Sequence, residues 1–458
     1  MVIELSNIIF TDQDDIVPLS GMEEIVNTGI VNTLAGNDLI IGTGNEYGFE
    51  NEGTLNTDDG NDTITGSAYI YGIITKYGST FDTGKGNDVI TGTGLLGLRN
   101  EGTLNTDDGN DTITGTGDFY GITTFPDSTL DTGKGNDVIT GTSTRDNSIG
   151  FENMGTSNTG DGNDIITGTG GSYGFQNLGT LNTDDGNDTI TGTGTEYGIS
   201  TWYGSTLDTG KGNDVITGIN SKGSSGFINK GTLNTGDGQD SIISHGAFDN
   251  NLNYYLGNGG EVFLGNGDDS IIITNPNHMN FLARLLTNTG IIETGNGDDT
   301  IVVAGYISSN IINTGNGNDF IFSQGLENFG GVFLEDGNDI IISNGIISNR
   351  GTINTGNGND FIIANEGFES GLDITGSVFL GEGKDYIKGF GTGDFYGEKG
   401  QDTLELTPGS YTVGISGAAV IFTTNSALMK TFEFEKLIAG GTTYDFSSLT
   451  AGQIITVA

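Results

Sequence analysis

A nine-residue segment at positions 313–321 recurs with small changes along most of the chain, and this repeat constrains the fold more than any other feature. Each copy contains a Gly-rich turn that ends in Asp. This last Asp, here called the aligned aspartate, occurs sixteen times at a mean spacing of about 24 residues. The aligned aspartates are Asp38, Asp62, Asp88, Asp111, Asp137, Asp164, Asp188, Asp214, Asp240, Asp269, Asp299, Asp319, Asp339, Asp360, Asp385 and Asp402. Such a repeat predicts a solenoid in which each coil is stabilised by stacking on its neighbours.

Two apolar positions flank each turn at fixed distances. Ile stands two residues after every aligned aspartate except the last, where Leu404 takes its place. Another apolar residue, such as Leu55 or Phe81, stands seven residues before each aligned aspartate, with Ser157 as the exception. β-Branched residues with alternating polar neighbours favour short strands. The sequence therefore predicts an all-β, parallel solenoid of about sixteen coils, with the Ile column inside and the turns along one outer edge.

The repeat also divides the chain into three parts. Residues 1–30 lack it and are predicted to form an N-terminal cap, residues 31–405 the solenoid, and residues 406–458 a β-rich C-terminal cap. Residues 277–286 are the one segment in which a helical turn is expected. Beyond residue 291 the coils shorten to 20–21 residues, which predicts a cross-section with two faces instead of three.

Charge and composition exclude several classes of function. The chain has 60 acidic and 15 basic residues, for a formal charge of −45, and so lacks the basic stripe that binds nucleic acid. There is no cysteine, which excludes disulfides and thiolate metal sites. No apolar run is long enough to predict a membrane-spanning helix. The first 15 residues contain no Lys or Arg, unlike a cleaved signal peptide.

The turns offer oxygen ligands. Each has one carboxylate and several backbone carbonyls, a set that suits Ca²⁺ better than Mg²⁺, Zn²⁺ or Cu²⁺. The two histidines, His245 and His278, lie in different coils. Stacked carboxylates about 5 Å apart would repel by roughly 0.8 kcal/mol in water and about 3 kcal/mol at an effective dielectric of 20. Up to about fifteen Ca²⁺ ions between coils would relieve this repulsion. The alternative for a single turn is an Asp that bonds only to turn amides.

The turn resembles the Gly-Gly-x-Gly-x-Asp-x-apolar-x nonapeptide of hemolysin-type (RTX) calcium-binding repeats. Residues 84–90 and 315–321 carry this resemblance, which covers about residues 31–405. It implies a right-handed parallel β-roll or β-helix that binds calcium between stacked turns. It also implies export by a type I channel through an uncleaved C-terminal signal, with which the uncharged residues 446–458 are compatible. The implied metal ligands are the carboxylates of all sixteen aligned aspartates and the carbonyls of Gly84, Gly86, Gly133, Gly135, Gly210, Gly212, Gly295, Gly297, Gly315, Gly317, Gly356 and Gly358.

Some turns depart from the family pattern. The usual family coil has about 18 residues and two calcium turns, whereas one turn per 20–30 residues here implies a single calcium column. The first Gly is replaced by Asp58, Asp107, Asp184, Leu34 and Asp336. These changes put the sites of Asp38 and Asp339 in doubt. Lys384 stands beside Asp385, and Asp402 ends the column, so weak binding is expected at both.

The leading interpretation is a non-enzymatic, calcium-binding solenoid that folds on binding calcium and acts as a secreted or cell-surface structural or adhesive protein. Surface polysaccharide and self-association both remain open as partners. A first alternative is a polysaccharide lyase or epimerase built on a β-helix, although the four arginines share no coil. A second is a calcium-dependent ice-binding protein. Similar antifreeze repeats have Thr where Asp59, Lys85 and Asn316 stand here.

Overall fold

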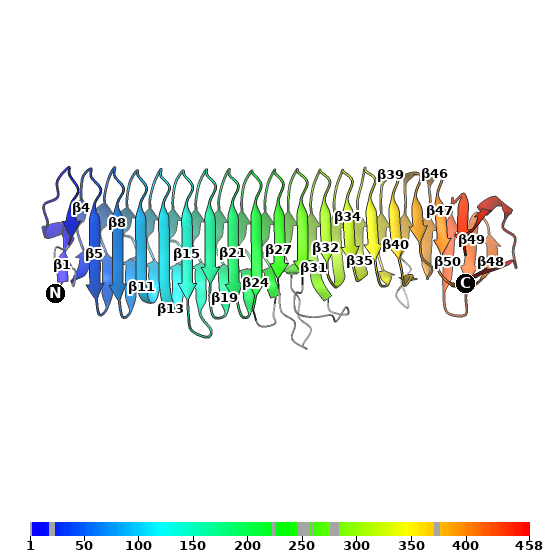
Figure 1. The fold of residues 1–458 in the computed structure, drawn as a ribbon, viewed down its shortest axis with the longest axis horizontal. Helices are drawn as coiled ribbons and strands as arrows, with labels where there is room; N and C mark the ends of the chain where they lie inside the picture. Colours follow the sequence, from blue (N-terminus) through cyan, green and yellow to red (C-terminus); the bar gives the residue numbers. More distant parts are fainter. Residues whose placement is uncertain are drawn as a thin grey trace. The chain divides into compact units, whose positions relative to one another are not determined.

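The computed structural model describes residues 2–17, 23–221, 225–245, 256–258, 260–274, 284–370 and 376–458. Its contacts divide the chain into two compact units, Met1–Asp249 and Asn250–Ala458. Within each unit the strands of successive coils lie side by side and pair in parallel (Figure 1). The predicted parallel β-solenoid is therefore confirmed. Among the described residues, no helix is long and apolar enough to span a membrane.

Each coil of the first unit has three short strands. A representative coil comprises β5 (Leu39–Gly44), β6 (Tyr47–Asn51) and β7 (Thr54–Asn56). These strands pair in parallel with β8 (Thr63–Ala68), β9 (Tyr71–Thr75) and β10 (Thr80–Asp82) of the next coil. Each coil therefore has three strands and three faces, with β6 as the strand between the two that flank the turns.

Stacked apolar columns form the core. Ile40 pairs with Ile64, and Leu55 with Phe81, so the same position of every coil meets its equivalent in the next. All sixteen residues of the Ile column are buried, as predicted. Ser157, the polar exception in the second column, is also buried, and its hydroxyl donates to Oδ1 of Asn153 at 3.1 Å. A satisfied hydroxyl is tolerated in the core for this reason.

The second unit keeps this cross-section with shorter connections. Its coils include β32 (Thr300–Val303) with β33 (Tyr306–Asn313), and β34 (Phe320–Ser323) with β35 (Gly325–Phe333). The predicted loss of one face is wrong, because the two halves of β35 pair separately with β37 (Ile347–Asn349) and β38 (Thr352–Asn354). The helical turn expected at 277–286 is also wrong at its end, since residues 284–286 belong to β31 (Arg284–Glu293). Residues 277–283 lie outside the described residues.

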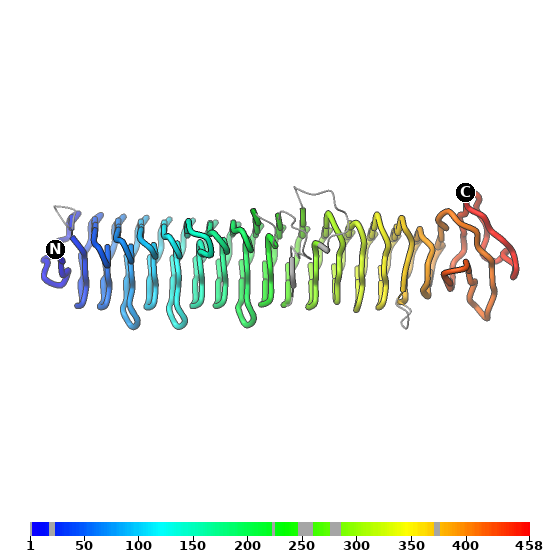
Figure 2. The backbone as a smooth tube through the Cα atoms, turned by 90° about the horizontal axis from the view of Figure 1, so that it is seen from below, coloured from blue at the N-terminus to red at the C-terminus, as the bar shows by residue number. Residues whose placement is uncertain are grey.

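The chain ends differ in how they close a coil. At the N-terminus, β1 (Val2–Glu4) pairs with β3 (Glu24–Asn27), and β2 (Ile16–Val17) pairs with β5, both in parallel. The N-terminal segment is therefore built as a partial coil. At the C-terminus, β48 (Gly409–Ser416), β49 (Ala419–Thr423) and β50 (Leu428–Phe432) turn antiparallel. Figure 2 shows the backbone coils that precede this change of direction.

Candidate metal centre

The turns share one backbone conformation. In all sixteen, the residue four positions before the aligned aspartate has a positive φ, between 53° and 104°. Glycine adopts this conformation without a steric cost, whereas other residues are strained in it. The non-glycine residues that adopt it are Leu34, Asp58, Asp107, Asp184, Glu335 and Glu398. In the turn of Asp339 the left-handed residue is thus Glu335, and the assignment of Asp336 to this position is wrong.

The second glycine of the turn, two positions before the aligned aspartate, is present in every copy. A Cβ added to Gly135 would lie 1.3 Å from the carbonyl oxygen of Gly109, and one added to Gly86 would lie 1.4 Å from that of Gly60. Only glycine fits where successive turns stack this closely. The carbonyls of the predicted ligands at this second-glycine position, such as those of Gly86 and Gly135, therefore face the equivalent glycine of the next coil.

The aligned aspartates are buried, not exposed along the edge. All sixteen are at most 2% exposed. In each unit Oδ1 of one aligned aspartate accepts a hydrogen bond from the backbone N–H of the aligned aspartate in the preceding coil, at 2.7–3.0 Å. The result is a ladder of carboxylates inside the turns. Bonding to turn amides, the alternative for a single copy, thus accounts for one oxygen of each carboxylate.

The second carboxylate oxygen, Oδ2, has no hydrogen-bond partner in most of the aligned aspartates. Oδ2 is buried and has no hydrogen-bond partner in Asp62, Asp88, Asp111, Asp137, Asp164, Asp188, Asp214, Asp299, Asp319, Asp339 and Asp360. An ionised carboxylate with a buried, unsatisfied oxygen is costly, so the group must bind a proton or a cation. The Oδ2 atoms are the strongest indication of a cation site in the described part of the chain.

The pKa values of these carboxyls reflect the same problem. Burial raises the pKa of Asp62 to about 6, that of Asp88 to about 7 and that of Asp339 to about 8. The backbone N–H of the preceding coil opposes this rise in each case, and so does a threonine hydroxyl beside Asp62 and Asp88. Without a bound cation, many of these groups would thus be partly protonated near pH 7.

A threonine stands five residues before the aligned aspartate in most coils, and its role was not predicted from the sequence. These buried residues are Thr33, Thr57, Thr83, Thr106, Thr132, Thr159, Thr183, Thr209, Thr235, Thr294, Thr314 and Thr355. In the remaining coils the position holds Leu264, Leu334, Leu380 or Gly397. The interior of the turn is thus lined by hydroxyl oxygens in some coils and by apolar atoms in others.

An outer ladder runs in the opposite direction on the solvent side. The residue just before the aligned aspartate is usually Asn, and its Oδ1 accepts from the backbone N–H of the equivalent residue in the following coil. For example, Asn87 N–H donates to Asn61 Oδ1 at 2.7 Å, and Asn110 N–H donates to Asn87 Oδ1 at 2.8 Å. The two ladders together satisfy successive amides of each turn, which fixes the carboxylates in place.

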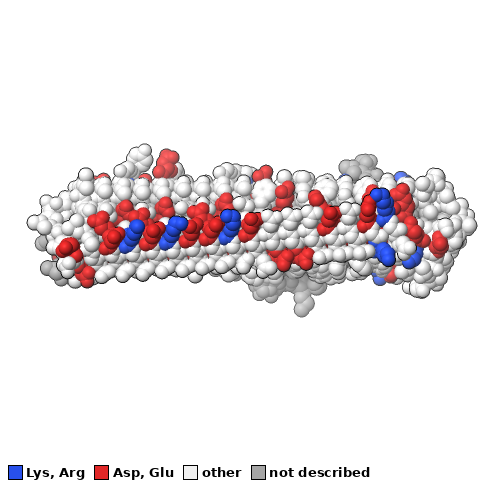
Figure 3. Space-filling model, turned by 90° about the horizontal axis from the view of Figure 1, so that it is seen from above, with Lys and Arg blue, Asp and Glu red and all other residues white. Residues whose placement is uncertain are grey.

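Charged residues alternate on the outer surface of the first unit, one position before the second glycine. Lys134 pairs with Asp161 at 2.5 Å and Lys211 with Asp185 at 3.5 Å. Figure 3 shows basic side chains set among acidic ones along this face. Because these pairs are exposed, they contribute little stability, but they favour the register in which opposite charges are neighbours.

Two further residues extend the inner ladder. The backbone N–H of Asp15 donates to Oδ1 of Asp38 at 2.8 Å, so Asp15 occupies the position of an aligned aspartate. At the other end, Oε2 of Glu435 accepts from Asp402 N–H at 2.8 Å. Sequence reasoning missed both, although Asp14-Asp15-Ile16-Val17 matches Asn37-Asp38-Leu39-Ile40 and could have indicated the first.

The remaining candidates are weaker. Within the described ranges, no three His, Cys, Asp or Glu side chains converge on a point that could hold a metal. A cation at the column would therefore need backbone or hydroxyl oxygens besides carboxylates. His245 ends β27 (Ser241–His245), and His278 lies outside the described residues.

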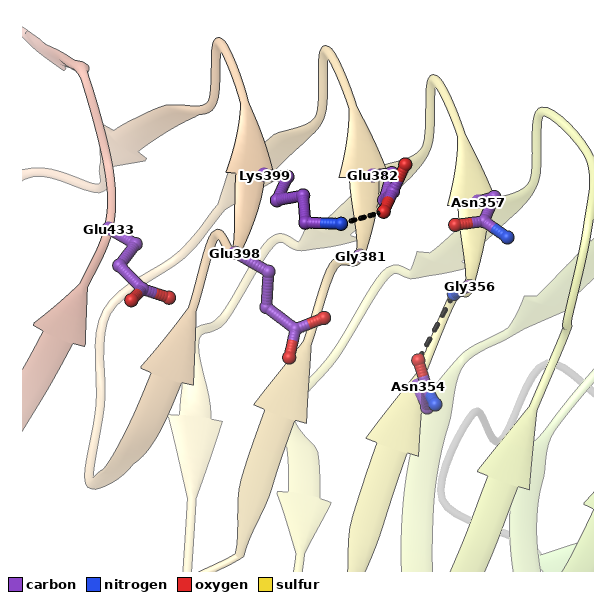
Figure 4. A pocket seen from close by; sticks show the side chains of 8 residues that line it. All are labelled: Asn354, Gly356, Asn357, Gly381, Glu382, Glu398, Lys399 and Glu433. Atoms are coloured by element: carbon purple, nitrogen blue, oxygen red, sulfur yellow. Dashed lines mark hydrogen bonds and ion pairs between the residues drawn. The ribbon is translucent and has the colours of Figure 1, made fainter.

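A cleft of about 590 Å³ opens in the second unit (Figure 4). It is lined by Asn354, Gly356, Asn357, Gly381, Glu382, Glu398, Lys399 and Glu433. Lys399 already forms an ion pair with Glu382 across it. The cleft lining is exposed and partly self-neutralised, so the cleft is a poorer candidate than the buried column.

Comparison with known proteins adds little. No model of a protein family and no curated protein sequence matches the chain. Among solved structures, the chain is similar to a hyperactive, Ca²⁺-dependent, β-helical antifreeze protein from an Antarctic bacterium. The sequence identity is 17%, the TM-score is 0.38, and the match covers 98% of this chain and 95% of that one. A likeness at this level supports no inference about function.

Proposed function

We propose that this protein is a calcium-binding solenoid in which the inner carboxylate ladder binds Ca²⁺. The observation that carries the proposal is the buried Oδ2 of successive aligned aspartates, which has no hydrogen-bond partner in coil after coil. One such atom could be neutralised by a proton. A column of them in a chain with a formal charge of −45 favours cations, because each divalent ion neutralises two carboxylates.

Calcium suits this site better than other ions. The atoms available are carboxylate, carbonyl and hydroxyl oxygens, which a hard cation with flexible coordination accepts. Mg²⁺ requires a stricter octahedron and retains waters that a closed turn has little room for. When bound, calcium would supply positive charge inside the turns. The residues of this chain would supply the fixed carboxylates, because the amide ladder already holds each Oδ1.

The proposed biological role is structural or adhesive, outside the cell or on its surface, without catalysis. It rests on the coupling of binding to folding: a chain with such charge repulsion would be mostly unfolded at low calcium near neutral pH and would fold fully where calcium is millimolar. Export through a type I route is consistent with this coupling. Ice binding is less favoured, because Lys134 and Lys211, at the position that would hold Thr in the antifreeze turn, form ion pairs.

Calcium removal and return test the proposal. The purified protein is unfolded in denaturant with EDTA, refolded with and without calcium, and followed by far-ultraviolet circular dichroism while bound calcium is counted by elemental analysis. We expect the full β-spectrum only with calcium, a much weaker one in EDTA near neutral pH, and several ions per chain. A matched refolding in magnesium controls for ionic strength. A calcium-free protein that regains the full β-spectrum and binds no calcium would refute the proposal.

A further inference from the structure

Several hydroxyls of the threonine column inside the turns donate to backbone carbonyls of the next coil. Thr57 donates its hydroxyl proton to the backbone carbonyl of Thr83 at 2.9 Å, and Thr183 donates to that of Thr209 at 3.2 Å. A hydroxyl has one proton and two lone pairs. While its proton is donated along the stack, each of these hydroxyls presents lone pairs to the rest of the turn. Oδ2 of the aligned aspartate of the same coil then has no donor in hydrogen-bond geometry, although the nearby hydroxyl lowers the pKa of that carboxyl.

In other coils both oxygens are left without a partner. Oγ1 of Thr83, Thr159 and Thr314 is buried and has no partner in hydrogen-bond geometry, although each hydroxyl is close enough to its aligned aspartate to lower the pKa of that carboxyl. The aligned aspartates five residues after these threonines are Asp88, Asp164 and Asp319, and the Oδ2 atom of each also has no hydrogen-bond partner. Two unsatisfied oxygens in one closed turn are costly. They are also the arrangement that a hard cation stabilises.

We propose that these threonine hydroxyls are calcium ligands and that they decide which coils bind calcium tightly. This inference rests on the proposed function. Coils in which the buried Leu334 or Leu380 replaces the threonine lack this hydroxyl, and they bind calcium weakly or not at all. The number of tight sites is then set by the threonines and is smaller than the number of aligned aspartates.

The competing explanation is a purely structural one, in which the hydroxyl donates to the carboxylate. Thr33 does so, since its hydroxyl donates to Oδ2 of Asp38. A hydrogen bond of this kind would stabilise the turn equally with and without calcium. The two explanations therefore differ in whether the effect of the hydroxyl depends on calcium.

Two consecutive coils of the second unit provide a matched experiment. Thr314 and Leu334 occupy the same position in coils of equal length. Thr314→Val removes the hydroxyl at nearly constant volume, and Leu334→Thr introduces one. Thr314→Ser keeps a hydroxyl at position 314. For each full-length variant, bound calcium is counted by equilibrium dialysis, and the thermal midpoint is measured with and without calcium.

We expect Thr314→Val to bind one ion fewer than wild type, Leu334→Thr to bind one more, and Thr314→Ser to bind the wild-type number. Terbium luminescence lifetimes, which report coordinated water, should change only where the ion count changes. Unchanged counts in Thr314→Val and Leu334→Thr, with a loss of stability in Thr314→Val that is equal with and without calcium, would overturn the inference but leave the proposed function intact. A wild-type protein that binds no calcium would overturn both.

Discussion

The backbone N–H of Asp164 donates to Oδ1 of Asp188 at 2.8 Å, so one coil fixes the carboxylate of the next. The same relationship recurs through both units and explains why the aligned aspartates face inward. This hydrogen bond uses Oδ1 of each carboxylate and fixes the position of Oδ2. Each proposed binding site therefore depends on two stacked coils.

Asp188→Asn should change stability in opposite directions with and without calcium. Asn keeps the oxygen that accepts from Asp164 but removes a buried charge. Without calcium at pH 7.5, we expect the variant to be more stable than wild type by about 1–2 kcal/mol. With saturating calcium it should be less stable and should bind one ion fewer. Denaturant titration in EDTA and in calcium measures both effects.

Asp185→Asn is the control for this substitution. Asp185 lies in the same turn, but it is exposed and pairs with Lys211 at 3.5 Å. Its replacement should change the free energy of unfolding by less than about 1 kcal/mol and leave the ion count unchanged. If Asp188→Asn destabilised the protein equally in EDTA and in calcium, the carboxylate would have no role in cation binding.

The calcium-free protein should be more stable in acid than at neutral pH. Burial raises the pKa values of aligned aspartates above 3.8, to about 6 at Asp62 and to about 8 at Asp339. The folded state thus holds protons that the unfolded state releases. This contribution to stability is complete below about pH 4 and is lost as the pH rises through 6–8.

The thermal midpoint in EDTA should therefore fall between pH 5 and pH 8. Saturating calcium should remove this fall, because the cations replace the protons. A midpoint in EDTA that stayed constant or rose over this range would contradict the burial of unpaired carboxylates.

Gly135→Ala should be among the most damaging single-methyl substitutions in the first unit. Its Cβ would meet the Gly109 carbonyl oxygen at 1.3 Å, which forces the two coils apart. We expect a loss of at least about 3 kcal/mol. Gly78→Ala is the comparison, since Gly78 has a positive φ of 76° but a Cβ added there would meet nothing within 4 Å. It should cost no more than about 1–2 kcal/mol. Equal losses would show that the close stacking is not what requires the second glycine.

Glu435 should close the ladder in the second unit through its side-chain oxygen. Its Oε2 accepts from Asp402 N–H, and Glu435→Ala would leave that amide without a partner at a cost of about 1–3 kcal/mol. Glu435→Gln retains an acceptor and should recover most of the loss. Hydrogen exchange at the Asp402 amide, compared among the three proteins, measures this directly. Equal protection of that amide in all three would rule out the capping role.

Much of the fold could be predicted from the sequence because every coil must bury its apolar residues and close a tight turn in the same way. The Ile column could be predicted since one buried β-branched residue per coil must stack on its equivalent, and Ile40 and Ile64 do so. Tight turns could be predicted from the glycines, and positive φ values at Gly84 and Gly315 confirm them.

The direction of the aspartate side chains could not be predicted. Strand alternation stops at a turn, so no periodic pattern distinguishes an inward from an outward Asp188. The role of Thr183 was missed for a related reason, because a threonine beside a turn is equally typical of an exposed strand end. Asp15 and Glu435 were missed because their turns lack the Gly-rich spacing that identifies the other copies.

The most direct test of the central claim is the position of the ions in crystals grown with calcium, located by anomalous scattering. We predict a row of peaks inside the turns, each about 2.3–2.6 Å from Oδ2 of an aligned aspartate such as Asp188 or Asp319. Peaks confined to the exposed charged surface, or no peak beside the buried Oδ2 atoms of the turns that contain a threonine, would contradict it.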